Sequence, residues 1–115
     1  MNYDAVFDKW HEECGVFGIY DRHLDVARYT YWGLFALQHR GQESAGIAVT
    51  NGDDIELAKN MGLLTEAIKE LPKLKGHIAT GHVRYSTTGS NSPRNIQPLV
   101  IHYQDGHMGV AHNGN

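Results

Sequence analysis

Several classes of protein are excluded by what these 115 residues lack, beginning with cysteine, of which there is one. A single thiol cannot form an intramolecular disulfide, so a secreted disulfide scaffold is excluded. Ten basic against thirteen acidic residues give a formal net charge of -3, and no basic excess favours nucleic-acid binding. The start of the chain lacks the regions of a signal peptide, and no apolar run is long enough to cross a bilayer. We therefore expect a cytoplasmic protein that binds neither nucleic acid nor membrane.

Hydrophobic residues make up 41% of the chain and charged residues 20%, which is typical of one globular domain. Residues 14–20 (CGVFGIY) are short and densely apolar, which predicts a buried strand. Residues 24–37 predict a helix with Gly41 as its C-terminal cap. The stripe expected to be buried on this helix contains Ala27, Tyr31, Leu34 and Phe35.

The rest of the chain reads mainly as strands. Two runs joined at Asn51-Gly52 predict a hairpin, and residues 63–72 predict a short helix that Pro72 ends. Three further strands are expected within residues 77–85, 96–103 and 107–113, with a polar loop at 86–95. A short amphipathic helix is expected at the N-terminus, with its apolar face formed by Tyr3, Val6, Phe7 and Trp10. Dominant strands with short connections favour an antiparallel α+β fold, in which the last three strands leave one sheet face bare.

Cys14 is the first candidate for chemistry, although a lone cysteine is usually a small buried residue. It lies between the Glu12-Glu13 pair and a glycine, at the mouth of the first strand. A thiol that acts as a nucleophile needs a base. One of the eight histidines could serve. Cleavage after Glu13 would instead free the α-amine of Cys14, whose reference pKa of about 7.7–8.0 suits it to accept the thiol proton.

Arg84 and Asn113-Gly114 are the candidate binding groups. Arg84 ends a strand beside hydroxyls and a glycine turn, where it can hold a carboxylate with Thr87 as a further donor. This requires a bend near Tyr85, and a solvated arginine is an equally good interpretation. Asn113-Gly114 is typical of a turn, but its side-chain amide and backbone N–H could also stabilise an oxyanion.

Metal and phosphate sites receive little support. His102, His107 and His112 recur every five residues, and positions five apart on one strand face opposite sides. No paired-cysteine or H-E-x-x-H pattern is present. The glycines in HRGQESAG lack the Lys-Ser/Thr pair of a phosphate loop, so a tight turn at Gly41 explains them better.

Four segments together resemble one family far more specifically than any of them does alone. They are CGVFGI from Cys14, LQHRGQESAG from Leu37, GHVRYST from Gly81 and AHNGN from Ala111. In this order they resemble the N-terminal glutaminase domain of the amidophosphoribosyltransferases, also called glutamine phosphoribosylpyrophosphate amidotransferases. The resemblance implies an N-terminal-nucleophile (Ntn) hydrolase αββα sandwich, two antiparallel sheets stacked between helix layers.

The resemblance also implies roles for individual residues. Residues 1–13 would be a propeptide whose removal exposes Cys14, the nucleophile that attacks the side-chain amide of glutamine. The oxyanion hole would be formed by Asn113 and Gly114. Arg84 would bind the α-carboxylate of the substrate with Thr87 close by. The loop near the thiol would be shaped by Arg40 and Gly41.

In such an enzyme the ammonia released from glutamine displaces pyrophosphate from phosphoribosyl pyrophosphate, the first step of de novo purine synthesis. Residues 14–115 would be the N-terminal part of the amidotransferase domain, without the phosphoribosyltransferase domain. We therefore expect a fragment with little or no glutaminase activity by itself. No metal or cofactor is expected in this chain; Mg²⁺ and, in some members, a [4Fe–4S] cluster would belong to the absent part. The full-length enzyme is expected to be a homo-oligomer.

Two other functions stay open from the residues alone. One is a Cys–His thiol hydrolase that uses an unprocessed Cys14, and its activity would survive a block of cleavage after Glu13. The other is a non-catalytic interaction domain in which Cys14 is merely buried.

Overall fold

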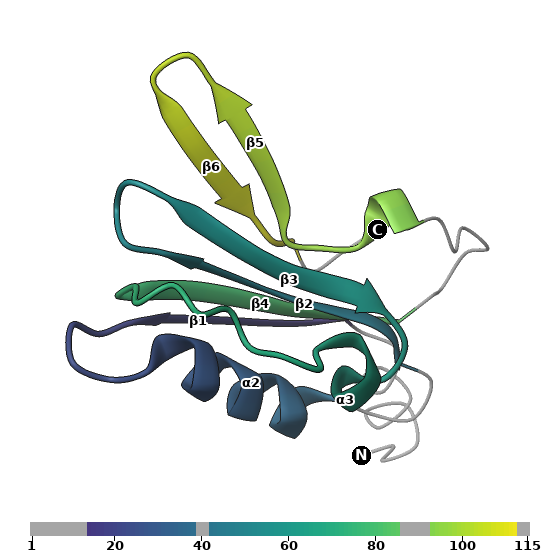
Figure 1. Ribbon diagram of the computed structural model, residues 1–115. Coiled ribbons are helices and arrows are strands. Elements are labelled where there is room, and N and C mark those ends of the chain that lie inside the picture. The colour runs from purple at the N-terminus through teal and green to yellow at the C-terminus, as the bar shows by residue number, and fades with distance from the viewer. Residues whose placement is uncertain (1–13, 39–41, 86–92, 113–115) are drawn as a thin grey trace, which may run out of the picture.

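A computed structural model of the protein describes residues 14–38, 42–85 and 93–112 (Figure 1). Every strand pairing in these ranges is antiparallel, as the α+β prediction requires. The expected N-terminal amphipathic helix lies outside the described residues. In chain order the described elements are β1 (Gly15–Tyr20), α2 (Val26–Leu37), β2 (Gln42–Thr50), β3 (Ile55–Met61), α3 (Leu64–Ala67), β4 (Ile78–Tyr85), a 3-10 turn (Pro93–Asn95), β5 (Leu99–Tyr103) and β6 (Gly106–Val110).

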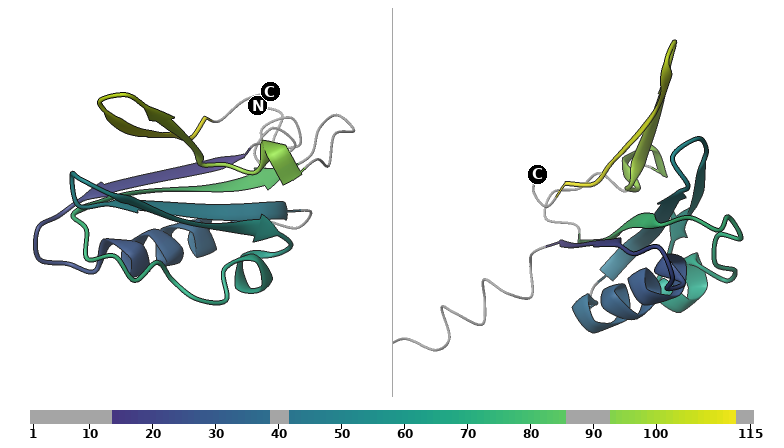
Figure 2. Two further views of the ribbon diagram at one scale, coloured as in Figure 1. Left: turned by 45° about the horizontal axis from the view of Figure 1, so that its top comes forward. Right: turned by 90° about the vertical axis from the view of Figure 1, so that its left-hand side faces the viewer.

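Four of the strands form one sheet in the order β1-β4-β2-β3, and β5 pairs with β6 in a separate two-stranded sheet. Both α2 and α3 lie on one side of the four-stranded sheet, and the β5–β6 hairpin lies on the other (Figure 1). The two further views in Figure 2 show the same arrangement, with the hairpin projecting away from the larger sheet. The four-stranded sheet therefore has two different faces, here called the helix face and the site face.

Two glycines show what each face packs against. A Cβ atom on Gly81 of β4 would come 2.6 Å from Thr30 and 2.8 Å from Leu34, both on α2. A Cβ atom on Gly46 of β2 would come 2.1 Å from the carbonyl oxygen of Gln97, in the segment that leads into β5. Gly81 therefore lets the helix approach β4, and Gly46 lets the 95–98 segment lie directly on the opposite face.

The hydrophobic core lies between the helix face and α2. β2 contributes every second side chain to it, as expected for a strand with one face toward the core. Its largest members have essentially no exposed surface, so burial of this face stabilises the sheet and α2 together. They are Leu34, Ile47, Val49, Leu64 and Val83.

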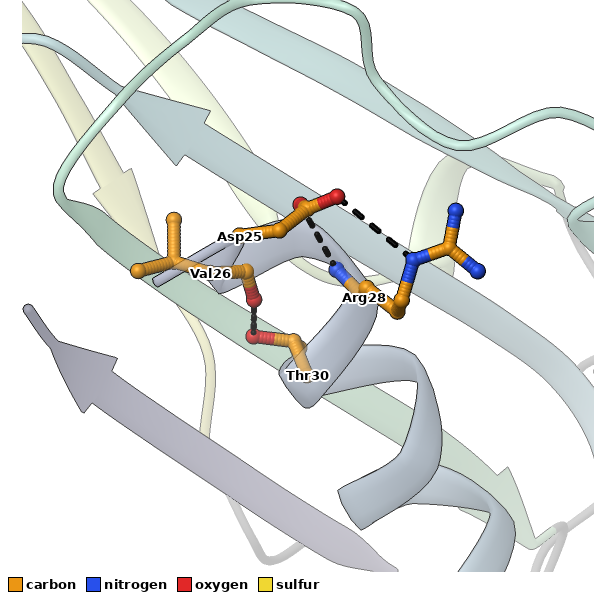
Figure 3. Close-up of polar contacts among 4 residues, drawn as sticks. All are labelled: Asp25, Val26, Arg28 and Thr30. Atoms are coloured by element: carbon orange, nitrogen blue, oxygen red, sulfur yellow. Dashed lines mark hydrogen bonds and ion pairs between the residues drawn. The ribbon is translucent and has the colours of Figure 1, made fainter. Parts of the chain in front are cut away.

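Helix α2 begins with a side-chain cap (Figure 3). The Arg28 N–H donates to Oδ1 of Asp25 (3.1 Å), which satisfies one of the backbone donors left free at a helix start. The Thr30 hydroxyl donates to the Val26 carbonyl (2.7 Å) and is thereby buried without an unpaired donor. Asp25 also pairs with the Arg28 guanidinium at 3.6 Å, but both side chains are more than half exposed, so this pair contributes little.

The expected helix at 24–37 is confirmed, but its buried stripe is partly wrong. Phe35 is 54% exposed, and Thr30 is buried instead. The contact of Gly81 with α2 explains the difference, because it brings the turn around Thr30 closest to the sheet. The helix ends at Leu37 with Gln38 at its C-cap, so the prediction that Gly41 caps it is also wrong.

The Asn51-Gly52 hairpin is confirmed, and Gly52 has the positive φ of +99° that its turn requires. The first strand is confirmed as β1, but it is an edge strand with alternate residues exposed and not a buried one. The second short helix is confirmed only for Leu64–Ala67. It ends at Ala67 with Ile68 at its C-cap, so Pro72 is not the residue that ends it.

The prediction that the last three strands leave one sheet face bare holds for β5 and β6 but is wrong for β4, which lies in the four-stranded sheet and packs against α2. Leucine, isoleucine, tyrosine, methionine and valine side chains from paired positions of β5 and β6 share one face of the hairpin, and each is at least 40% exposed. They are Leu99, Ile101, Tyr103, Met108 and Val110. Within the three described ranges, no helix has the length and hydropathy needed to cross a membrane.

Candidate active site

Cys14 lies directly before β1, at the end of the sheet where β4 terminates. Its thiol donates to the Tyr85 carbonyl (3.7 Å), and the Tyr85 N–H donates to the Cys14 sulfur (3.5 Å). The side chain is partly buried. The sulfur is therefore held against the backbone of β4 and is still accessible in part, as a nucleophile must be.

Arg84 is the register neighbour of Cys14. Gly15 pairs with Val83, so continuing the antiparallel pairing by one residue places Cys14 opposite Arg84. The Arg84 guanidinium donates through Nη1 to the Asn95 carbonyl (3.0 Å). A guanidinium has five N–H donors, of which this bond uses one. The structure thus brings together the candidate thiol and the candidate carboxylate-binding group.

The bend that joint use of Arg84 and Thr87 requires is compatible with β4, which ends at Tyr85. Tyr85 is itself buried, and this burial, followed by the nearby charge of a Cys14 thiolate, raises the pKa of the Tyr85 phenol to about 12. The phenol is therefore neutral at physiological pH. A neutral neighbour adds no negative charge that would repel a thiolate or a substrate carboxylate.

A further residue of β4 on the site face, His82, was not chosen as a site candidate from the sequence. His82 is 1% exposed and pairs in register with Val16 of β1 and Gly46 of β2. Its Nε2 lies 3.1 Å from the His112 carbonyl oxygen. Burial lowers the pKa of His82 to about 4, so the ring is neutral at pH 7, and it carries its proton on Nε2 because the carbonyl can only accept.

The segment 95–98 lies across the site face and accepts hydrogen bonds from Arg84, Lys59 and His112. Arg84 donates to Asn95, as described above. The Lys59 ammonium on β3 donates to the carbonyls of Ile96 (2.8 Å) and Pro98 (3.1 Å), and burial lowers the pKa of Lys59. The Gln97 side chain then accepts a hydrogen bond from the His112 N–H (2.5 Å). These bonds connect the four-stranded sheet to the stretch that follows β6.

Among the described residues, two buried polar atoms on the site face have no hydrogen-bond partner, namely Ser44 Oγ and His82 Nδ1. Ser44 pairs with Arg84 and Gly46 pairs with His82, so all four residues share one face. Asn95, Gln97, Lys59 and Ser44 carried no recognisable spacing in the sequence. The signal that could have found His82 is a titratable side chain in the middle of a strand whose neighbours are mostly apolar.

The other predicted site residues, Arg40, Gly41, Thr87, Asn113 and Gly114, lie outside the described residues. Their predicted roles stay predictions. No hydrogen bond joins Cys14 to an imidazole of the described part of the chain, where the sulfur contacts the Tyr85 backbone. This geometry offers no base for the Cys–His alternative among those histidines.

The five-residue spacing of the histidines does not correspond to positions along one strand. His102 and His107 do not lie on one strand; they are direct partners across β5 and β6, with their Nδ1 atoms 2.6 Å apart. Within residues 14–38, 42–85 and 93–112, no group of three or more histidine, cysteine, aspartate or glutamate side chains could hold a metal ion. A [4Fe–4S] cluster held by four thiolates does not fit a sequence with one cysteine.

A hollow of about 760 Å³ lies at the opposite end of β1 and β4 from Cys14. Its walls come from the β1–α2 connection, the start of α2 and residues 71–77. It shares no residue with the thiol, the guanidinium or the 95–98 segment, so it is not part of the candidate site.

Comparison with known proteins places these observations in a family, although no protein-family model matches the chain. Amidophosphoribosyltransferase of Staphylococcus aureus (strain MRSA252) is 52% identical over 107 residues, which are 90% of this chain and 22% of that protein. Amidophosphoribosyltransferase of Methanocaldococcus jannaschii is 53% identical over 104 residues, which are 88% of this chain and 22% of that protein. The chain thus spans about a fifth of the length of the curated relatives it matches.

Solved structures give the same result. Glutamine phosphoribosylpyrophosphate amidotransferase from B. subtilis, complexed with ADP and GMP, matches with a TM-score of 0.73 and 45% identity. The match covers 84% of this chain and 21% of that chain. A second structure, of the allosteric regulatory enzyme of purine biosynthesis, matches with a TM-score of 0.73 and 46% identity over 82% of this chain and 21% of that chain.

The likeness to these structures confirms the α+β fold class of the Ntn type, of which the described residues form a part. Half of the matched residues are identical over nearly the whole of this chain. The chain is therefore homologous to the amidophosphoribosyltransferases and corresponds to about a fifth of their length.

Proposed function

We propose that the chain carries the nucleophile and the carboxylate-binding arginine of a glutaminase that belongs to an amidophosphoribosyltransferase. The observation that carries this proposal is the position of Cys14, whose sulfur contacts the backbone of Tyr85, the residue after Arg84. The homology to amidophosphoribosyltransferases supports glutamine as the ammonia donor and phosphoribosyl pyrophosphate as the acceptor in the whole enzyme.

Glutamine carries a carboxylate at one end and an electrophilic amide at the other, the two groups that an arginine and a thiol would bind and attack. Four carbon–carbon bonds of about 1.5 Å separate its α-carboxylate carbon from its side-chain amide carbon, so the extended molecule spans roughly 5 Å between the two. Arg84 would hold the carboxylate through two parallel N–H donors, with Thr87 as an additional donor. The amide carbon would then lie beside the Cys14 sulfur at the neighbouring strand end.

The reaction follows as acyl transfer. Removal of residues 1–13 frees the α-amine of Cys14, which accepts the thiol proton, and the thiolate attacks the amide carbon. Asn113 and Gly114 stabilise the oxyanion, and the C–N bond breaks as the amine leaves with a proton to become ammonia. Water then cleaves the thioester to give glutamate. Arg40 and Gly41 shape the loop near the thiol.

Residues 14–115 are in this proposal the N-terminal part of the amidotransferase domain. The phosphoribosyltransferase chemistry, its Mg²⁺ and any iron–sulfur cluster belong to the remaining four-fifths of the enzyme. A homo-oligomeric cytoplasmic enzyme is part of the same proposal.

The role of Arg84 is tested by glutamine hydrolysis in the native polypeptide that contains these residues. Hydrogen bonds to charged groups contribute about 1.5–3 kcal/mol, so Arg84→Met is expected to raise KM for glutamine roughly 10- to 100-fold. Arg28→Met, an exposed arginine at the far end of the sheet, serves as the control and leaves KM unchanged. An Arg84→Met enzyme with the original KM would contradict the assignment.

Cleavage before Cys14 separates the proposal from a Cys–His hydrolase. Blocking removal of residues 1–13 by substitution of Glu13 is expected to abolish glutamine hydrolysis, because the α-amine then stays in a peptide bond. Intact-mass measurement verifies whether the processed chain starts at Cys14. Full activity in an unprocessed chain would favour the Cys–His alternative.

A further inference from the structure

The backbone of His112 is held on both sides by side chains, although the residue itself is exposed. Its N–H donates to Gln97 Oε1 (2.5 Å), and its carbonyl oxygen accepts from His82 Nε2 (3.1 Å). His112 lies two residues beyond the end of β6, where no strand pairing orients the chain. Hydrogen bonds with two side chains therefore orient this peptide, as strand pairing orients the peptides of β5 and β6.

A histidine buried at this position lowers the stability of the fold unless its N–H makes a favourable hydrogen bond. The imidazole is 1% exposed, and its Nδ1 has no hydrogen-bond partner among the described residues. An apolar side chain of similar size would fill the same volume without burying an unpaired nitrogen. The feature that such a side chain would lack is the Nε2–H donor that reaches the His112 carbonyl.

The backbone around Gln97 is held by contacts with β3 and β2. Lys59 donates to the carbonyls on both sides of it, at Ile96 and Pro98. The absence of a side chain at Gly46 lets the Gln97 backbone lie against β2. The donor to the His112 carbonyl and the acceptor for its N–H are thus both fixed to the same four-stranded sheet.

The two hydrogen bonds to the backbone of His112 also constrain the start of the next residue, Asn113. The carbonyl carbon of His112 is bonded to the nitrogen of Asn113, and the atoms of a peptide unit lie in one plane. The same plane contains the Cα atom of the next residue, so fixing the carbonyl also constrains the atom from which the proposed Asn113 side-chain donor extends and the chain continues toward Gly114. Oxyanion donors are effective only within about 2.7–3.1 Å of the developing charge, so a small rotation of this peptide would misplace them.

We propose that His82 and Gln97 are positioning residues for the oxyanion hole, acting through the backbone of His112. This inference rests on the proposed function, in which Asn113 and Gly114 supply the oxyanion donors. Neither His82 nor Gln97 contacts glutamine. They hold the chain that presents the donors.

The test compares paired variants of the native polypeptide in glutamine hydrolysis. His82→Leu fills the volume without a donor, and His82→Gln keeps an N–H donor. Gln97→Met removes the acceptor, and Gln97→Glu keeps an oxygen acceptor. We expect kcat to fall about 10- to 100-fold in His82→Leu and Gln97→Met with KM within about threefold, because Arg84 still binds the α-carboxylate. The two conservative variants are expected to recover most of kcat.

A second readout distinguishes positioning from general damage. Alkylation of Cys14 by iodoacetamide needs the thiolate but no oxyanion hole, so its rate is expected to stay unchanged in all four variants. Loss of kcat together with loss of alkylation, equally in the leucine and glutamine variants, would show a structural role and overturn the proposal. If His82→Leu does not fold, Gln97→Met and Gln97→Glu carry the test, because Gln97 is not in the core.

The possible failures are distinguishable. If the unaltered polypeptide hydrolyses glutamine and both His82→Leu and Gln97→Met keep kcat within twofold, the positioning proposal is wrong and the proposed function stands. If the unaltered polypeptide does not hydrolyse glutamine at all, the proposed function is wrong and the positioning proposal falls with it. His23→Leu, an exposed histidine at the far end of β1, controls for the loss of an imidazole.

Discussion

At the scale of single residues, the buried imidazole of His82 couples stability to pH. Its folded-state pKa of about 4 lies below the value near 6.5 of an exposed histidine, mainly because burial disfavours the charged ring. Between these two values the unfolded state binds more protons than the folded state. The free energy of unfolding therefore rises with pH across this window.

We predict that acidification from pH 6.5 to pH 4 costs the folded protein roughly 3 kcal/mol through His82 alone. Above about pH 7.5 this group contributes almost no pH dependence, because the ring is then neutral in both states. Urea denaturation of the native polypeptide at a series of pH values measures the slope. His82→Gln removes the titrating group and is expected to flatten the slope between pH 6.5 and 5; an equally steep slope in that variant would rule out His82 as its cause.

Single residues also show what a sequence can and cannot reveal about a site. Cys14 and Arg84 could be chosen as candidates from the sequence, because a lone thiol before a strand and an arginine at a strand end carry recognisable chemistry; their catalytic roles stay predictions. His82 and Gln97 were missed, since their roles depend on partners 30 and 15 residues away. Contacts between segments that far apart follow from the register of the sheet, which no local pattern contains.

At the scale of elements, the close approach of the 95–98 segment to β2 depends on Gly46. We predict that Gly46→Ala lowers the free energy of unfolding by at least about 1–3 kcal/mol, the range typical of overpacking. This is a large effect for a single substitution. The reason is that the new Cβ would meet the Gln97 carbonyl and the Lys59 side chain at 2.1 and 2.8 Å.

Thermal denaturation measures this effect, and Gly18→Ala is the matched control. Gly18 lies in a strand of the same sheet, and nothing lies within 4 Å of the Cβ it would gain. The control is expected to be neutral or slightly stabilising. Equal effects of the two substitutions would contradict the packing described for the site face.

The N-cap of α2 provides a second prediction at this scale. Asp25→Ala removes the acceptor for the Arg28 N–H and is expected to cost about 1 kcal/mol of stability, whereas Asp25→Asn keeps a capping oxygen and costs much less. Chemical denaturation at low and high salt checks the cause. A loss in Asp25→Asn as large as in Asp25→Ala, abolished by salt, would assign the effect to the exposed ion pair with Arg28.

Elements were predictable where the pattern was local. The Asn51-Gly52 hairpin follows from turn chemistry and the end strands from their apolar runs. The exposure of Phe35 and the early end of α3 were not predictable in this way. The exposure of Phe35 depends on where α2 meets the sheet, which the contact at Gly81 sets. The helix α3 ends at Ala67, before the next helix-breaking residue of the sequence.

At the scale of the whole molecule, the four-stranded sheet separates the hydrophobic core from the candidate site. Its helix face is buried under α2 and α3 and holds the hydrophobic core. Its site face carries Cys14 at one corner, His82 and Arg84 along β4, and the 95–98 segment above them. The two-stranded sheet of β5 and β6 presents an exposed apolar face. The chain corresponds to about a fifth of the length of its relatives.

The most direct measurement of the central proposal is to trap the covalent intermediate. The native polypeptide is mixed with glutamine, quenched in acid and digested, and the mass of each cysteine-containing peptide is determined. We expect a peptide that begins at Cys14 and carries a γ-glutamyl group on sulfur, absent from Cys14→Ala, which does not hydrolyse glutamine. Glutamine hydrolysis by Cys14→Ala at the original rate would contradict a nucleophilic role for Cys14.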